Sequence, residues 1–137
     1  MKILPIVVLI LCLSFSTVHA FDEAKLVTVD QFEDLEFKAT GVKLNNFSID
    51  EKTAFLVSHM KNIAVSFSAR NKLEDARHFS VMLVGMSDKQ ILWSMDLEPL
   101  LATISPKKTE SVSGSTYVSA GTLSATQKIW IRVVGDI

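Results

Sequence analysis

The stretch IAVSFSAR, residues 63–70, alternates large apolar side chains with small or polar ones. In an extended chain Ile63, Val65 and Phe67 project to one side, because successive side chains of a strand point to opposite faces. This period of two predicts a half-buried β-strand. Similar runs recur about every ten residues after it, with turn residues between them, as is typical of a sandwich or a barrel.

The next run, residues 79–86, is apolar on both of its faces. Phe79, Val81 and Leu83 share one face, whereas Met82, Val84 and Met86 share the other. A strand of this kind is central in its sheet or covered on two sides. Residues 87–90 supply turn chemistry before another alternating run at 91–96, so we predict a β-hairpin here.

Further strands are predicted at residues 109–118 and 128–134, and upstream at 35–44 and 54–57. Residues 30–36 are ambiguous between a capped helical turn and a strand. Pro99 makes residues 97–104 a turn or an edge crossing, because proline cannot donate to a central ladder. We therefore expect one antiparallel immunoglobulin-like β-sandwich of six to eight strands over residues 21–137, with residues 21–32 as a possible loose N-terminal arm.

The first twenty residues have the pattern of a cleaved signal peptide. Lys2 precedes an apolar run of about 13 residues, too short to span a bilayer, and Val18-His19-Ala20 forms a small-x-small cleavage site. A retained anchor and a lipoprotein at Cys12 are the alternatives, but Leu11 is too bulky for the lipoprotein site. Cleavage after Ala20 removes the one cysteine, so we expect a bacterial periplasmic or secreted protein.

Composition argues against several partners. Without Lys2 the mature chain has 13 basic and 15 acidic residues, so its near-neutral surface gives no general attraction to nucleic acid or to a membrane. We expect neither as a partner, and no membrane insertion after cleavage. Asn46 begins an Asn-Phe-Ser glycosylation triplet, which matters only if the source is eukaryotic.

Residues 63–130 carry a family resemblance. A strand ending in Asn71, a hairpin with a short polar turn at 87–89 and a turn at 105–107 resemble bacterial exported immunoglobulin-like domains of the FxLYD type. The usual Asp-Gly of the hairpin is missing, and Pro106 is followed by Lys107 instead of glycine. The resemblance implies a sandwich with a role in binding or assembly, and it assigns no catalytic residue.

No motif in the sequence indicates catalysis or a cofactor. His59 and His78 lie nineteen residues apart without a local third ligand, so we expect no metal site. No serine lies in a Gly-x-Ser-x-Gly elbow, and the glycines are scattered singly. We predict a non-enzyme with no cofactor. A small hydrolase that uses two carboxylates stays an alternative, because any chain of this length has many acidic pairs.

Tryptophan and methionine positions suggest an interaction surface instead. Trp93 alternates with Ile91 and Met95, so we place it in the core. Trp130 and Arg132 share the face opposite Ile129, Ile131 and Val133, so we expect both outside, unless a loop or the arm covers them or Arg132 stacks on the ring.

We expect the strands of Ile63 and Phe79 to pair. Ala64, Ser66 and Ser68 would then lie beside Met82, Val84 and Met86 and form a shallow apolar floor. Either the N-terminal arm or another protein chain would cover this floor, because large apolar patches are unusual on soluble monomers. The candidate interaction residues are Met82, Val84, Met86, Trp130 and Arg132. As an alternative, a structural subunit would donate residues 21–32 to a neighbour by strand addition.

Overall fold

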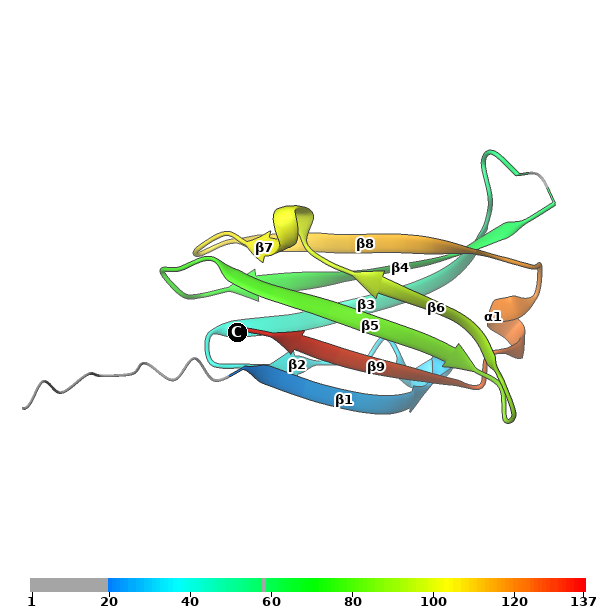
Figure 1. Ribbon diagram of the computed structural model, residues 1–137, viewed down its shortest axis with the longest axis horizontal. Helices are drawn as coiled ribbons and strands as arrows, with labels where there is room; N and C mark the ends of the chain where they lie inside the picture. The colour runs from blue at the N-terminus through cyan, green and yellow to red at the C-terminus, as the bar shows by residue number, and fades with distance from the viewer. Residues whose placement is uncertain (1–19, 58) are drawn as a thin grey trace, which may run out of the picture.

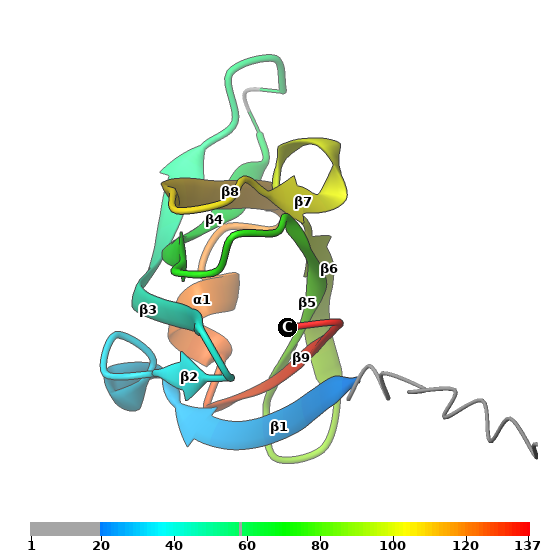
Figure 2. The ribbon, with the colours of Figure 1, turned by 90° about the vertical axis from the view of Figure 1, so that its left-hand side faces the viewer.

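The computed structural model describes residues 20–57 and 59–137, which form two antiparallel sheets facing each other (Figures 1 and 2). The first sheet has the order β1 (Phe21–Thr28), β9 (Lys128–Gly135), β5 (Arg77–Met86) and β6 (Ile91–Leu97), with β7 (Thr103–Ile104) beside the start of β5. The second has the order β2 (Phe37–Lys38), β3 (Val42–Thr53), β4 (Lys61–Asn71) and β8 (Thr109–Val118). The predicted antiparallel β-sandwich is confirmed, with seven long strands and two of two residues each in the described chain. The predicted signal peptide, residues 1–20, lies outside the described residues except for Ala20.

The core follows the alternation of the sequence. Ile63, Val65 and Phe67 point inward from β4, and Phe79, Val81 and Leu83 point inward from β5, all of them buried. On β9 the buried face is the aliphatic one, formed by Ile129, Ile131 and Val133. The two inner faces meet as one apolar cluster between the sheets.

A bulge in β3 departs from the expected strand boundaries. We predicted strands at 35–44 and 54–57, but β3 runs through Val42–Thr53, and residues 54–57 belong to the loop that follows it. The register between β3 and β4 shifts between Asn45 and Ser48, and Asn46 has a φ of 55°. The extra residue of this β-bulge turns Phe47 inward, and asparagine tolerates the left-handed backbone.

Residues 21–28 form a strand rather than a loose arm. β1 pairs with β9 from Phe21 opposite Gly135 to Thr28 opposite Lys128. Lys25 donates to the backbone oxygen of Glu36 at 2.6 Å and lies 4.5 Å from the ring centre of Phe37, which connects β1 to the second sheet. Residues 21–28 form a strand because the ladder with β9 satisfies their backbone hydrogen-bonding groups.

The expected pairing of the Ile63 and Phe79 strands is wrong. β4 pairs with β3 and β8, whereas β5 pairs with β6 and β9, so the two runs lie in opposite sheets. Their apolar faces pack against each other across the core instead of lying side by side. Alternation in a sequence identifies the face of a strand but not its neighbour.

The predicted hairpin between β5 and β6 is confirmed, and it holds Trp93 in the core. The turn closes with the Ser87 amide donating to the Gln90 carbonyl at 3.0 Å. Trp93 is 5% exposed, and its indole N–H donates to the Thr126 hydroxyl at 3.0 Å. A Cβ at Gly85, directly opposite on β5, would lie 2.0 Å from the indole nitrogen. The ring therefore requires glycine at this position.

The crossing from β6 to β8 contains a short 3-10 helix, η2 (Leu100–Ala102), after Pro99. Buried Asn71 anchors the nearby turns. Its amide group donates to the carbonyls of Asp75 and Ile104, at 2.8 and 3.2 Å, and its side-chain oxygen accepts from the Leu73 amide. The end of β4 is thereby tied to both neighbouring loops.

Replacing Gly85 by alanine should destabilise the protein by about 1 to 3 kcal/mol, because the new methyl group overlaps the Trp93 indole in a packed core. Urea denaturation followed by circular dichroism measures the free energy of unfolding. Ser94→Ala, on the exposed face of β6, is the control and should change it by less than about 0.5 kcal/mol. Equal stability of the two variants would show that Trp93 moves freely.

Candidate functional site

The five candidate residues from the sequence all lie on the outer face of the first sheet. Val84 is directly opposite Trp130, and Met82 is directly opposite Arg132, in the ladder between β5 and β9. Met86 continues the same face of β5, opposite Lys128. The structure therefore brings together residues that are 44 or more positions apart in the sequence.

β1 extends this surface instead of covering it. Leu26 lies directly opposite Trp130, so Leu26, Trp130 and Val84 form one apolar row across three neighbouring strands. Leu26 is 56% exposed and Met82 is 38% exposed, whereas Trp130 and Val84 are half-buried. We call Leu26, Met82, Val84, Met86 and Trp130 the outer patch. Leu26 was missed because its segment was interpreted as an arm.

Arg132 is held at the border of the outer patch by Asp22. Its guanidinium donates two hydrogen bonds to the two carboxylate oxygens, at 2.8 and 2.7 Å. The pair lowers the pKa of Asp22 and raises that of Arg132, chiefly through the side-chain hydrogen bond. Arg132 lies opposite Ala24 on β1, and Asp22 lies two residues from Ala24, on the side away from Trp130. The guanidinium is therefore directed to Asp22 and does not stack on the Trp130 ring.

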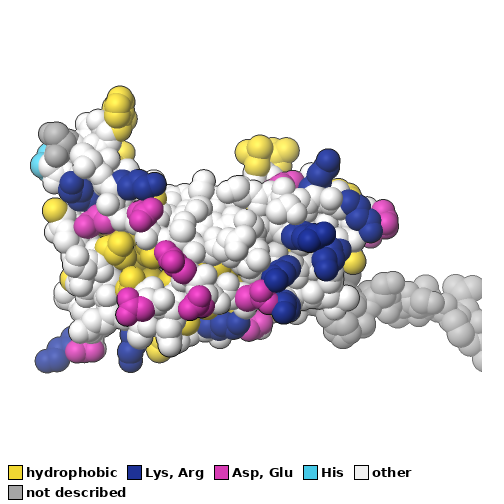
Figure 3. Space-filling model, turned by 180° about the vertical axis from the view of Figure 1, so that it is seen from behind, with side chains coloured by type: hydrophobic (Ala, Val, Ile, Leu, Met, Phe, Trp, Pro, Cys, Tyr) yellow, Lys and Arg dark blue, Asp and Glu magenta, His cyan; other side chains and the backbone are white. Residues whose placement is uncertain are grey.

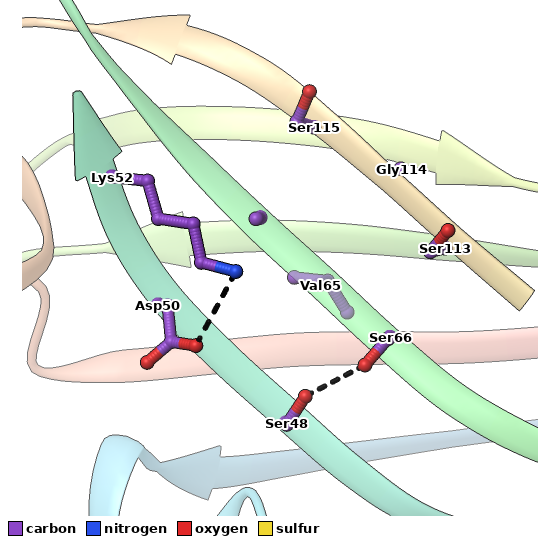
Figure 4. Close-up of a pocket in the computed structure, with 9 residues that line it drawn as sticks. Ser48, Asp50, Lys52, Val65, Ser66, Ser113, Gly114 and Ser115 are labelled. Atoms are coloured by element: carbon purple, nitrogen blue, oxygen red, sulfur yellow. Dashed lines mark hydrogen bonds and ion pairs between the residues drawn. The ribbon is translucent and has the colours of Figure 1, made fainter. Parts of the chain in front are cut away.

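The other half of the expected floor lies on the far side of the molecule. Ala64 and Ser66 line a shallow hollow on the outer face of the second sheet, with a volume of about 330 Å³ (Figures 3 and 4). The remaining lining residues come from β3, β4 and β8: Ser48, Asp50, Lys52, Val65, Ser113, Gly114 and Ser115. The hollow exists because serine, alanine and glycine residues lie next to one another on three adjacent strands.

The hollow offers hydrogen bonds rather than catalysis. The hydroxyl oxygens of Ser48 and Ser66 are hydrogen-bonded at 2.7 Å, and the Lys52 ammonium lies 3.9 Å from a carboxylate oxygen of Asp50 (Figure 4). Nucleophilic catalysis requires a base that activates the serine. None of the nine lining residues is a histidine or a cysteine, and the one carboxylate is next to a lysine. The side chains that line this shallow hollow can donate and accept hydrogen bonds.

The histidines are far apart. His59 lies in the loop between β3 and β4, and His78 lies near the start of β5, and Figure 1 shows these segments at opposite ends of the sandwich. In the described part of the chain, no three side chains of the His, Cys, Asp and Glu types come together to hold a metal ion. Nor does any helix in residues 20–57 and 59–137 have the length and hydropathy of a membrane span.

Glu36 joins two lysines at the edge of the second sheet. Its carboxylate oxygens lie 2.5 Å from the Lys38 ammonium and 2.7 Å from that of Lys43, which faces Lys38 across β2 and β3. The hydrogen bonds from Lys38 and Lys43 lower the pKa of Glu36 to about 2. A carboxyl with a lowered pKa stays ionised and suits an ion pair, whereas a general acid requires a raised one.

Glu36 should make the protein sensitive to acid. Because its pKa falls from 4.5 to about 2 on folding, its stabilising effect is complete above pH 4.5 and is lost as the pH falls toward 2. Glu36→Gln should therefore be less stable than the original protein at pH 6, and the difference should disappear near pH 2. Urea denaturation at several pH values measures this, and a constant difference down to pH 2 would contradict it.

Residue geometry is the basis on which the function of this chain can be argued. The described residues offer an apolar outer patch on one sheet and a polar hollow on the other. Comparison of the chain with protein-family models, with curated proteins and with solved structures gave no match.

Proposed function

We propose that this protein is an exported, non-catalytic binding or assembly domain that docks another protein chain on the outer patch. One observation carries the proposal, the apolar row of Leu26, Trp130 and Val84 across three strands. Tryptophan is enriched among the residues that dominate protein interfaces, and methionine beside it adapts to a partner's shape. The nearby Asp22–Arg132 pair would supply the polar border that such interfaces have.

The geometry also indicates why the patch would serve another chain rather than this one. β1 is fully used in its ladder with β9 and lies beside the patch. Leu26 and Met82 are exposed, and Trp130 and Val84 are half-buried, so the described segments leave much of the outer patch accessible. Burying such a surface gains about 25 cal/mol for each Å² of apolar area. Docking would thus be driven mainly by the hydrophobic effect.

Strand exchange is the second candidate function. β1 lies at the edge of the first sheet, has one hydrogen-bonded neighbour, and begins at the first mature residue, Phe21. An edge strand at a chain end can leave its own sheet and pair with the same site of a neighbour, which is domain swapping. This candidate differs from docking because its subunits would polymerise through residues 21–28.

Met82→Asp should leave the free protein folded and abolish docking. Since Met82 is exposed, the free energy of unfolding should change by less than about 0.5 kcal/mol. When a photo-crosslinking amino acid replaces Val84 and the cells that express the protein are irradiated, we expect a covalent adduct with another protein chain. Adding Met82→Asp should remove that adduct.

The matched control is the same crosslinker at Ser111, exposed on the opposite sheet. An adduct of equal yield from both positions, or from neither, would contradict docking on the outer patch. A ladder of self-adducts that disappears when residues 21–28 are deleted would instead establish strand exchange.

Export itself gives a separate expectation. If residues 1–20 are a cleaved signal, the mature protein begins at Phe21, the first residue of β1. Intact-mass measurement of the protein from the extracytoplasmic fraction should give the mass of residues 21–137. A protein that keeps residues 1–20 would contradict cleavage and favour an anchored form.

A further inference from the structure

A group of four cations lies at one end of the outer face of the second sheet. Lys38, Lys43 and Arg70 form a row across β2, β3 and β4, each directly opposite the next. Lys72 lies beside the row, since its amide donates to the Gly41 carbonyl and it lines a hollow together with Lys38 and Lys43. We call these four residues the cation cluster. Figure 3 shows dark blue side chains gathered at this end, away from the β3–β4 loop.

The cation cluster carries more charge than its neighbours neutralise. Glu36 pairs with Lys38 and Lys43, but no ion pair joins Arg70 or Lys72 to an acid within residues 20–57 and 59–137. Strands lie about 4.8 Å apart, so the three cations of the row fall within about 10 Å. Like charges directly opposite each other destabilise a sheet. The repulsion is relieved when an anion binds.

A small hollow opens inside the cation cluster. It has a volume of about 170 Å³ and is lined by Lys38, Lys43 and Lys72, with Ala39, Gly41 and Val42 between them. Lys38 and Lys43 share the single carboxylate of Glu36, and Lys72 has no ion pair within the described residues, so the hollow keeps a net positive charge that attracts one acidic group. The hollow has room for one acidic group, and a chain that carries such groups at intervals can place one here and extend along the neighbouring face.

The face next to the cation cluster is rich in hydroxyls, and its two charged side chains, Asp50 and Lys52, pair with each other and leave it without net charge. Beyond the Lys43–Arg70–Thr109 row come the rows Asn45–Ser68–Ser111 and Ser48–Ser66–Ser113, and the last outward residue of β8 is Tyr117. Tyr117 is 54% exposed. From Thr109 to Tyr117 the face is about 27 Å long, at about 3.4 Å per residue. Its hydrogen-bonding groups lie in line with the cations.

We infer that the outer face of the second sheet binds an acidic polysaccharide. The cation cluster carries this inference: its cations take the carboxylate or sulfate groups, and one such group fills the hollow at Lys72. The serine and asparagine side chains hydrogen-bond the neutral sugar hydroxyls, and Tyr117 stacks on a sugar ring at the far end. This site lies on the opposite sheet from the outer patch, so it neither requires nor excludes protein docking.

Two other polyanions fit the face less well. Single-stranded nucleic acid is bound through several aromatic side chains on which the bases stack, and this face presents only Tyr117. An anionic membrane favours cations beside apolar side chains that enter the interface. None of the exposed large apolar side chains among the described residues belongs to the cation cluster, and Tyr117 is the one that lies on the neighbouring hydroxyl-rich face. The exposed side chains of this kind are Leu26, Phe55, Leu56, Met82, Ile91, Leu100, Leu101 and Tyr117.

The test measures binding of the purified protein to polygalacturonate at low ionic strength by calorimetry. We expect saturable binding that weakens as salt rises, because counterions are released. The double variant Lys43→Gln, Arg70→Gln should weaken it at least about tenfold. The control double variant Lys89→Gln, Lys128→Gln removes two exposed cations elsewhere and should leave it nearly unchanged. Circular dichroism checks that both variants are folded.

Tyr117→Ala gives an independent measurement. It should weaken the binding of long oligogalacturonates that span the face, but not that of a trimer, which reaches only the cation cluster. No binding of polygalacturonate, or an equal loss in both double variants, would overturn the inference. Tighter binding of oligothymidylate, or of vesicles with phosphatidylglycerol, would replace the polysaccharide by nucleic acid or by a membrane.

Discussion

The packing of Phe47 holds the sandwich together. Its ring stacks on Phe67 at 5.0 Å and meets Phe32 and Phe37 edge-on at 5.7 and 6.0 Å. Phe67 in turn lies 6.1 Å from Phe79 of the first sheet, so a continuous series of rings joins both sheets. Phe47 faces inward only because the bulge at Asn46 shifts the alternation of β3 by one residue. One left-handed residue thus allows the longest strand to contribute to the core on both sides of its bend.

The same bulge explains which parts of the fold could be predicted from the sequence. The positions and buried faces of β4, β5 and β9 were predicted correctly, because their alternation is unbroken. β6 and β8 were located by the turns around them, and Trp93 was correctly placed in the core, but Ile91 on the same face of β6 is 67% exposed. In β3 the buried residues are Val42, Leu44, Phe47 and Ile49, a spacing that no single period of two fits. β1 has the sequence FDEAKLVT, in which charged and apolar residues follow no period of two, so this strand could not be predicted from its composition and depends on its pairing with β9. Neighbours across a sheet depend on long-range register, which a single sequence does not contain.

The two candidate surfaces show the same limit. Met82, Val84, Met86, Trp130 and Arg132 could be identified as outward residues because β5 and β9 alternate cleanly, and they adjoin because those strands pair. The cations of the second sheet are separated by up to 34 positions, from Lys38 to Lys72, in a chain whose formal net charge is −1. The net charge of the whole chain does not reveal such a cluster, because the ladders among β2, β3 and β4 are what bring these cations together. Local concentration of charge is therefore a property of the fold, whereas the average is a property of the composition.

The place of β9 affects the order of events when the chain is made. β9 lies between β1 and β5, so the first sheet cannot close until residue 135 has been synthesised. Contacts between the ends of a chain form slowly, because the loop between them must close first. Until then β1 has no partner strand, and the inward face of β5 has no completed sheet around it. A chain with this topology can form its second sheet and the β5–β6 hairpin during elongation, but it completes its first sheet only at the end of synthesis.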